Sequence, residues 1–198
     1  MLERRSAIAS GLAAGGRAPL GITGCHLGEV AGFGLLQVAG FRKTMGEVER
    51  VVGTACGCIV PRRLSDTVRA GDLTVLRTGP EQLWIVGPAE RLGVEEAIRT
   101  GIGPTVGAVT PLSHSRTRIF IEGEMSRDVL AKGIPLDLHA DVFAVGEAAL
   151  TGLDHTPVLL HRVAADRYEI YAMRTFALTV WEWLADAALQ YGYEVVAG

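Results

Sequence analysis

The chain has 198 residues, a mass of 21.0 kDa and a net charge of −3, with a pI near 6.0. This length fits one good-sized domain or two small fused ones, and the nearly balanced charge removes the electrostatic reason to expect nucleic acid or an acidic membrane. Hydrophobic residues reach 48%, yet no run approaches the ~20 apolar residues that span a bilayer. Such a composition favours a protein that covers part of its surface with a partner.

Three cysteines, Cys25, Cys56 and Cys58, are too few and too uneven in number for a disulfide framework. A structural zinc site needs four ligands, and no second cysteine pair exists to complete one with Cys56 and Cys58. The sequence therefore predicts reduced thiols and no metal in a cytoplasmic protein.

Residues 1–32 are rich in glycine and alanine and carry basic residues at Arg4, Arg5 and Arg17. Glycines interrupt the short apolar stretch that a secretion signal would need. We therefore expect an N-terminal arm over residues 1–32 that has little structure of its own and becomes ordered only where it lies on another surface.

Two successive sets of strands and helices follow this arm, as judged from alternating apolar residues in strands and from three-to-four-residue spacing in helices. The first set is predicted to span residues 34–40 (strand), 43–53 (helix), 73–77 and 83–86 (hairpin), 89–99 (helix) and 106–110 (strand). The second set is predicted to span residues 116–122 (strand), 126–132 (helix), 148–153, 158–163 and 167–172 (strands), 175–192 (helix) and 194–196 (strand).

The helix predicted over residues 175–192 has the clearest pattern in the chain. Thr175 is its expected N-cap, and Gly192 is the left-handed residue expected after its end. Polar residues form one narrow stripe, and apolar residues, including Trp181, cover both flanks. An ordinary surface helix has one apolar stripe of about 100°. Either this helix lies deep in its own domain, or one flank contacts another chain.

Matching features recur at a nearly constant offset. Gly40 corresponds to Gly123 and Leu83 to Tyr168, at separations of 83 and 85 residues. This weak duplication agrees with the order of the predicted elements. We predict a single α+β domain over residues 33–198, built from two pseudo-repeated, ferredoxin-like halves at about 33–111 and 112–198.

Nucleotide-binding and catalytic motifs are incomplete in this sequence. The Gly-Lys pair of a phosphate-binding loop never occurs, and Gly32-Phe33-Gly34 lacks the third glycine of a dinucleotide fingerprint. Ser113 and His114 are neighbours that point to opposite faces of a strand, and no nucleophile elbow surrounds them. The sequence therefore predicts neither a self-contained FAD or NAD site nor a hydrolytic centre.

The other histidines also form no metal-ligand cluster. His155 and His161 lie six residues apart, about 20 Å along a strand, and this is too far for two ligands of one metal. His139 lies in the loop PLDLHAD, where we expect it to cap the loop or to contact a partner.

A polar and basic string, His114 to Arg118, marks the junction of the two halves. Arg116 and Arg118 share one face of the predicted strand, and two guanidinium groups on one face favour carboxylates. These carboxylates belong either to a ligand or partner chain, or to acidic residues of this chain.

Three strings in the second half carry a family resemblance: LSHSRTRIFIEG from Leu112, VLAKGIPLDLH from Val129, and DRYEIYAMRTFALTVWEWLADAALQYG from Asp166. Together they resemble the gamma subunit of heterotetrameric sarcosine oxidase. The hairpin GPEQLWIVG and the strand GFGLLQV in the first half add support. This resemblance implies the folate-binding fold of the glycine-cleavage aminomethyltransferases.

The resemblance also implies a role in an enzyme complex. Alpha, beta, gamma and delta subunits together demethylate sarcosine oxidatively, and they yield glycine, hydrogen peroxide and either formaldehyde or methylenetetrahydrofolate. FAD, FMN and NAD are expected on the larger subunits and zinc on delta, whereas gamma is expected to be structural and to have no catalytic residue. The K-G-C-Y-x-G-Q string of related folate proteins is replaced here by Lys132-Gly133-Ile134-Pro135.

The alternative function is a stand-alone folate-binding or aminomethyltransferase-like protein. Trp84 would then stack on the ligand, and Arg116 and Arg118 would pair with its glutamate tail. The six candidate contacts for a partner or ligand are Trp84, His114, Arg116, Arg118, His139 and Trp181.

Overall fold

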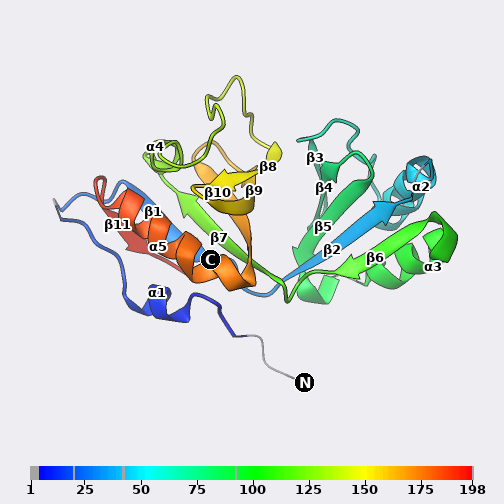
Figure 1. The fold of residues 1–198 in the computed structure, drawn as a ribbon, viewed down its shortest axis with the longest axis horizontal. Coiled ribbons are helices and arrows are strands. Elements are labelled where there is room, and N and C mark those ends of the chain that lie inside the picture. Colours follow the sequence, from blue (N-terminus) through cyan, green and yellow to red (C-terminus); the bar gives the residue numbers. More distant parts are fainter. Residues whose placement is uncertain (1–4, 20, 42, 92, 198) are drawn as a thin grey trace. The chain divides into compact units, whose positions relative to one another are not determined.

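The computed structural model of the chain describes residues 5–19, 21–41, 43–91 and 93–197. Figure 1 shows its helices and strands. In chain order they are α1 (Ala9–Ala13), β1 (Cys25–Glu29), β2 (Phe33–Gly40), α2 (Met45–Cys56), β3 (Thr67–Ala70), β4 (Leu73–Gly79), β5 (Gln82–Pro88), η1 (Ala89–Arg91), α3 (Val94–Val106), β6 (Gly107–Pro111), β7 (Arg116–Glu122), α4 (Ser126–Leu130), β8 (Ala148–Leu153), β9 (Thr156–Arg162), β10 (Arg167–Met173), η2 (Arg174–Phe176), α5 (Ala177–Ala188) and β11 (Tyr193–Val195).

The chain divides into two compact units, and each is built on one sheet. We call residues 32–113 the central unit, and residues 1–31 together with 114–198 the terminal unit. This mixed α+β architecture confirms the predicted fold class. Every strand and helix predicted from residue 33 onward is present, most of them with shifted ends, and β3 is additional.

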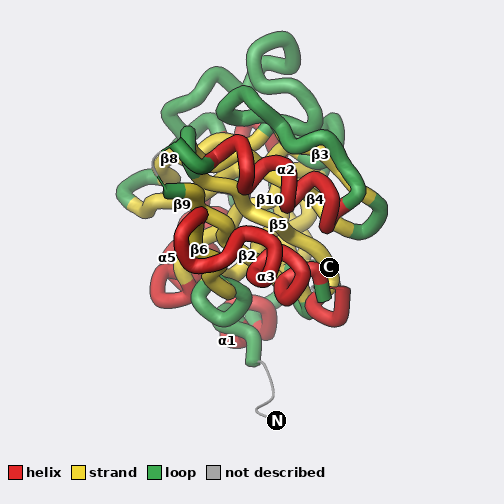
Figure 2. Tube along the Cα trace, turned by 90° about the vertical axis from the view of Figure 1, so that its right-hand side faces the viewer, coloured by secondary structure: helices red, strands yellow, loops and turns green. Residues whose placement is uncertain are grey.

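The sheet of the central unit is antiparallel and has the strand order β3-β4-β5-β2-β6. Both α2 and α3 cover the same face of this sheet, and Figure 2 shows them in front of its strands. Because strand side chains alternate between faces, every second residue of β2 and β5 points at these helices. The resulting core contains Leu36, Val38, Val48, Val51, Val52, Val60, Leu73, Val75, Leu83, Ile85, Ile98, Ile102 and Val109.

The terminal unit contains a mixed sheet with the strand order β11-β1-β7-β10-β9-β8. All its strand pairs are antiparallel except β1 with β11. One face packs against α4 and α5, and its core includes Leu27, Ile119, Ile121, Leu160, Tyr168, Ile170, Val180, Trp181 and Leu184. Fully burying one aliphatic side chain of this core stabilises the unit by about 1.5–3 kcal/mol.

The ends of α5 differ in part from the prediction. Thr175 lies inside the 3-10 turn η2, so its backbone is already helical, and Phe176 takes the N-cap position without a side-chain hydrogen bond. Thr175 is therefore not the N-cap. Gly192 has the predicted left-handed conformation, with φ 73°. A side chain there would overlap the carbonyl oxygen of Ile22, so glycine is also needed for close packing.

The described part of residues 1–32 is ordered on the chain's own terminal unit. Strand β1 lies between β7 and β11, with Cys25 and Leu27 fully buried. Helix α1 packs on α5, where Gly11 lies against the ring of Trp181. The backbones of Arg17 and Tyr193 exchange two hydrogen bonds of 2.8 Å. The surface on which this segment becomes ordered is therefore part of its own molecule.

Candidate functional site

A polar network lies on the sheet face of the terminal unit that points away from α5. Pairing of the strands places Arg118 beside Tyr171, and Glu169 between Phe120 and His161. These residues alternate along their strands with residues of the α5-facing core, so they share the opposite face. Three strands, β7, β9 and β10, thus contribute charged or polar side chains to one place.

Arg118 and Glu169 form the centre of this network. Nε of Arg118 donates to Oε2 of Glu169 at 2.9 Å, and Nη2 donates to Oε1 at 2.8 Å. The Tyr171 hydroxyl donates to the same carboxylate at 3.1 Å, and the Arg118 guanidinium lies 5.5 Å from the centre of the Tyr171 ring. The carboxylate beside Arg118 therefore comes from this chain, which is one of the two possibilities that the sequence left open.

His161 completes the network as a buried imidazole. Its Nδ1 is buried and has no hydrogen-bond partner within the described residues. Burial lowers the pKa of His161 to about 4, although the nearby Glu169 opposes this shift and Arg118 adds to it. Burial also raises the pKa of Tyr171. At neutral pH both groups are uncharged, so the network contains one closed ion pair and two neutral polar side chains.

The six predicted contact residues are divided between the two units. Trp84 belongs to the central unit, whereas His114, Arg116, Arg118, His139 and Trp181 belong to the terminal unit. Trp84 is 4% exposed, and its Nε1 donates to Oε1 of Gln37 at 3.3 Å. Arg116 and Arg118 do share a face of β7, as predicted.

The remaining three lie in separate local settings. His114 is exposed. His139 is also exposed and belongs to a self-contained turn, in which its Nδ1 accepts from the backbone N–H of Asp141 at 3.4 Å. Trp181 is only 3% exposed because α1 covers its ring. In this structure the apolar flank around Trp181 is thus occupied by the chain's own N-terminal segment.

The described ranges contain possible metal ligands and cysteines. No set of three or more His, Cys, Asp or Glu side chains there is arranged to hold a metal ion. All three cysteines are free thiols. Burial raises the pKa of Cys56 to about 12 and that of Cys25 to about 11, so both are protonated at neutral pH.

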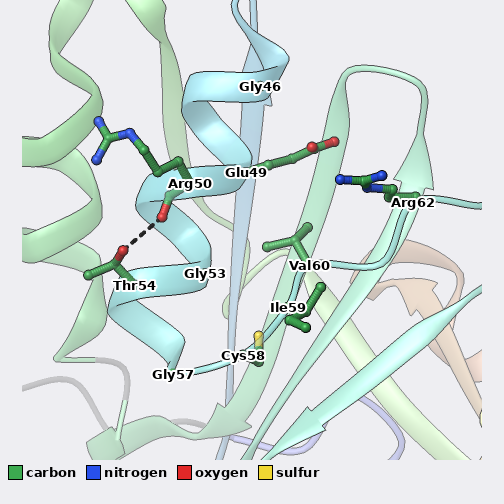
Figure 3. A pocket seen from close by; sticks show the side chains of 10 residues that line it. All are labelled: Gly46, Glu49, Arg50, Gly53, Thr54, Gly57, Cys58, Ile59, Val60 and Arg62. Atoms are coloured by element: carbon green, nitrogen blue, oxygen red, sulfur yellow. Dashed lines mark hydrogen bonds between the residues drawn. The ribbon is translucent and has the colours of Figure 1, made fainter.

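A second feature is an open groove on α2 in the central unit, which we call the α2 groove (Figure 3). Helix α2 ends at Gly57, whose left-handed conformation (φ 69°) lets the chain turn back along the helix. The returning segment, residues 58–62, then runs beside α2. A side chain at Gly53 would come within 2.8 Å of the Cys58 carbonyl oxygen, so glycine permits this close approach. The groove has a volume of about 660 Å³.

Arg77 fixes the back of the α2 groove. Its Nη1 donates to Oε1 of Glu49 on α2 at 2.6 Å and to the carbonyl oxygen of Pro61 at 3.0 Å. Its Nη2 donates to the carbonyl oxygen of Pro80 in the hairpin at 2.8 Å. One buried guanidinium thereby holds the helix, the returning segment and the β4–β5 hairpin together.

The α2 groove presents apolar and basic groups together. Ile59 is 86% exposed, although the next residue, Val60, is buried in the core of the unit. Arg50 stands on one side of α2 and Arg62 on the other (Figure 3). The groove can therefore receive an apolar group and bind a negative charge.

The sequence analysis did not single out Glu169, Arg77 or Ile59, and it considered His161 only as a metal ligand. Glu169 had a visible signal, because it is a charged residue inside the otherwise apolar strand YEIYAM. Arg77 and Ile59 had no such signal, since their roles depend on chain segments that meet only in the folded structure.

Comparison with solved structures defines the class of protein. Aminomethyltransferase T of the glycine cleavage system from Bartonella henselae superposes with a TM-score of 0.60, at 15% identity, over 88% of this chain and 48% of that chain. At this identity the likeness concerns the fold alone. The chain thus has the aminomethyltransferase-type α+β fold, as predicted.

Closer matches define the family. The model of the sarcosine oxidase, gamma subunit family matches residues 48–190. The sarcosine oxidase gamma subunit of Corynebacterium sp. (strain U-96) is 30% identical over 149 residues, which are 74% of this chain and 71% of that protein. A chain of the heterotetrameric sarcosine oxidase from Corynebacterium sp. U-96, solved with pyrrole 2-carboxylate, superposes with a TM-score of 0.83 at 27% identity, over 95% of this chain and 96% of that chain. The chain belongs to the sarcosine oxidase gamma-subunit family.

Proposed function

We propose that this chain is the gamma subunit of a heterotetrameric sarcosine oxidase and assembles with alpha, beta and delta subunits. One observation carries the proposal: nearly the whole chain, 95%, superposes on nearly the whole of a chain from such a heterotetramer, 96%, with a TM-score of 0.83. The two chains therefore share one architecture over nearly their whole lengths. The complex would oxidise sarcosine to glycine with oxygen as acceptor, and would release hydrogen peroxide together with formaldehyde or methylenetetrahydrofolate.

Within this complex we propose a non-catalytic role for the chain in the cytoplasm. FAD, FMN and NAD would be bound by partner subunits, and this chain would bind none of them. The engagement of Arg118 with Glu169 supports this role, because the strongest candidate for an anion-binding guanidinium is already paired within the chain. In the described ranges, no helix is both long and apolar enough to cross a membrane.

Co-expression with the three other subunits tests the assembly. The tagged chain should co-purify with all three in equal amounts, and the complex should oxidise sarcosine, whereas the purified chain alone should not. Multi-angle light scattering of the eluted peak gives its mass. A chain that is soluble and folded but elutes alone from this mixture would contradict the proposal.

Titration with tetrahydrofolate tests the alternative, a stand-alone folate-binding protein. We expect the purified chain to show no saturable binding up to millimolar concentration, because Trp84 and Arg118 are already engaged with side chains of their own unit. Saturable binding in the micromolar range, lost in Trp84→Ala or Arg116→Ala, would favour the alternative.

A further inference from the structure

We propose that the α2 groove is a docking site for a segment of a partner subunit that presents an apolar side chain next to a carboxylate. The proposal rests on the proposed function, since it assumes that the chain assembles with other subunits. It concerns only the central unit, and every residue of the argument belongs to α2 with its C-cap Gly57, to the segment 58–62 or to the hairpin that supports them.

The shape of the groove provides room for a side chain from outside. A Cβ atom added at Gly46 or at Gly57 would meet nothing within 4 Å, so both positions open into free space. Ile59 and Val60 line the wall opposite α2. An inserted apolar side chain would therefore lose its contact with water against Ile59 and the glycine backbone, and each buried CH₂ group stabilises such a contact by about 0.8 kcal/mol.

The charges of the groove select an acidic partner. Three charged residues line it: Glu49, Arg50 and Arg62. Arg77 already binds the Glu49 carboxylate at 2.6 Å. In the described part of the chain no carboxylate forms an ion pair with Arg50 or Arg62. Arg62 stands on the side of α2 where Ile59 and Val60 lie, and Arg50 on the opposite side (Figure 3), so Arg62 is the guanidinium beside the apolar wall that can bind a carboxylate through two hydrogen bonds.

The groove is also held in one shape before binding. The three hydrogen bonds of Arg77 fix α2, Pro61 and the hairpin relative to one another, and Val60 is anchored in the core. Exposed Ile59 lies between these fixed points. A preformed site loses little conformational entropy on binding, which favours docking over a merely exposed loop.

Charge argues against a second copy of this chain as the occupant. In a twofold dimer formed through the groove, the same patch would face itself, and Arg50 and Arg62 would meet their own counterparts. Like charges that face each other across an interface oppose association. An acidic-apolar segment of a different subunit has no such conflict.

Two variants of the full chain in the co-expressed complex test the docking site. Gly46→Leu fills the groove, and Arg62→Glu reverses its charge; both positions are exposed, so the fold should persist. We expect each variant to bind the other subunits at least tenfold more weakly, measured by titration of the purified chain onto complex assembled without it. Arg62→Lys should bind like the wild type at low salt.

Matched substitutions outside the groove serve as controls. Gly93→Leu changes an equally open glycine next to α3, and Arg69→Glu reverses an exposed charge on β3. Both should assemble like the wild type.

If Gly46→Leu and Arg62→Glu are folded by circular dichroism and also assemble like the wild type, the docking site is overturned and the proposed function stands. A concentration-dependent dimer of the lone chain that Gly46→Leu abolishes would overturn it in favour of a second copy. If the wild type fails to assemble, the proposed function itself fails.

Discussion

Arg118 and Glu169 form a two-point ion pair across neighbouring strands β7 and β10, with donor–acceptor distances of 2.9 and 2.8 Å. The carboxylate of Glu169 is almost fully buried, with 5% of its side chain exposed, and the Arg118 side chain is 19% exposed. Because little water reaches either side chain, each charge is stabilised mainly by the other. Removal of either side chain would leave the other charge poorly solvated.

Breaking one side of this pair should destabilise the chain strongly. Arg118→Met leaves a buried carboxylate without its countercharge, so we expect a loss of about 3 kcal/mol in the free energy of unfolding, measured by urea denaturation. Replacing both residues, as Arg118→Met with Glu169→Leu, should recover at least half of that loss. Equal losses in the single and double variants would mean that the pair does not couple the strands.

His161 should make stability depend on pH. Burial lowers its pKa from 6.5 to about 4, so between these values the unfolded chain binds a proton that the folded chain does not. The free energy of unfolding should therefore fall as the pH drops from 6.5 to 4, by up to about 3 kcal/mol. His161→Gln should flatten this part of the profile.

The control for this profile is His155→Gln, because the side chain of His155 is 97% exposed. It should retain the wild-type pH dependence. A His161→Gln variant whose stability falls with acid as steeply as that of the wild type would show that other groups cause the dependence.

Gly11 should be required for α1 to cover Trp181. A Cβ atom at Gly11 would overlap the indole ring, so Gly11→Val should displace α1 and expose Trp181 to water. We expect a red-shifted tryptophan emission and stronger acrylamide quenching. Ala13→Val changes an exposed residue of the same helix, and it should leave both signals as in the wild type.

Arg77 should stabilise the central unit through its three hydrogen bonds. Arg77→Met removes all three and leaves Glu49 without its partner, so we expect a loss of about 2–4 kcal/mol, together with faster amide hydrogen exchange in residues 58–62. Arg69→Met is the matched control, since this arginine is exposed and bonds only weakly to Gly71. Unchanged exchange in Arg77→Met would contradict the anchoring role.

Much of the fold could be predicted because its elements carry local patterns. Strand β7 was predicted at residues 116–122 and β8 at 148–153, and the structure has the same bounds. In both cases the pattern and the flanking turns lie within a few residues of each other. The order of the elements and the α+β class followed from such local signals, and the family strings then indicated the aminomethyltransferase-type fold.

The segment before residue 33 could not be predicted in this way. Strand β1, CHLGE, has no clear alternation, and it is a strand because it pairs with β7 and β11, which lie far away in the sequence. Gly28 there allows the ring of Phe120 to approach the backbone. The local sequence pattern of residues 25–29 contains no information on the distant strands with which they pair.

Only part of the polar network could be predicted, because some of its contacts depend on strands that lie far apart in the sequence. The shared face of Arg116 and Arg118 follows from the period of a strand, so it could be read from the sequence. The partner of Arg118 depends on the register between β7 and β10, which no local pattern specifies. Whether His114, Arg116 and His139 contact another subunit stays a prediction.

The position of β1 between β7 and β11 has a consequence for biosynthesis. Residues 25–29 leave the ribosome long before their parallel neighbour, residues 193–195. The sheet of the terminal unit therefore cannot be completed until residues 193–195 have emerged, whereas residues 32–113 contain their own complete sheet and core. A nascent chain stalled before residue 193 would carry a complete central unit, and one edge of β1 would still be unpaired.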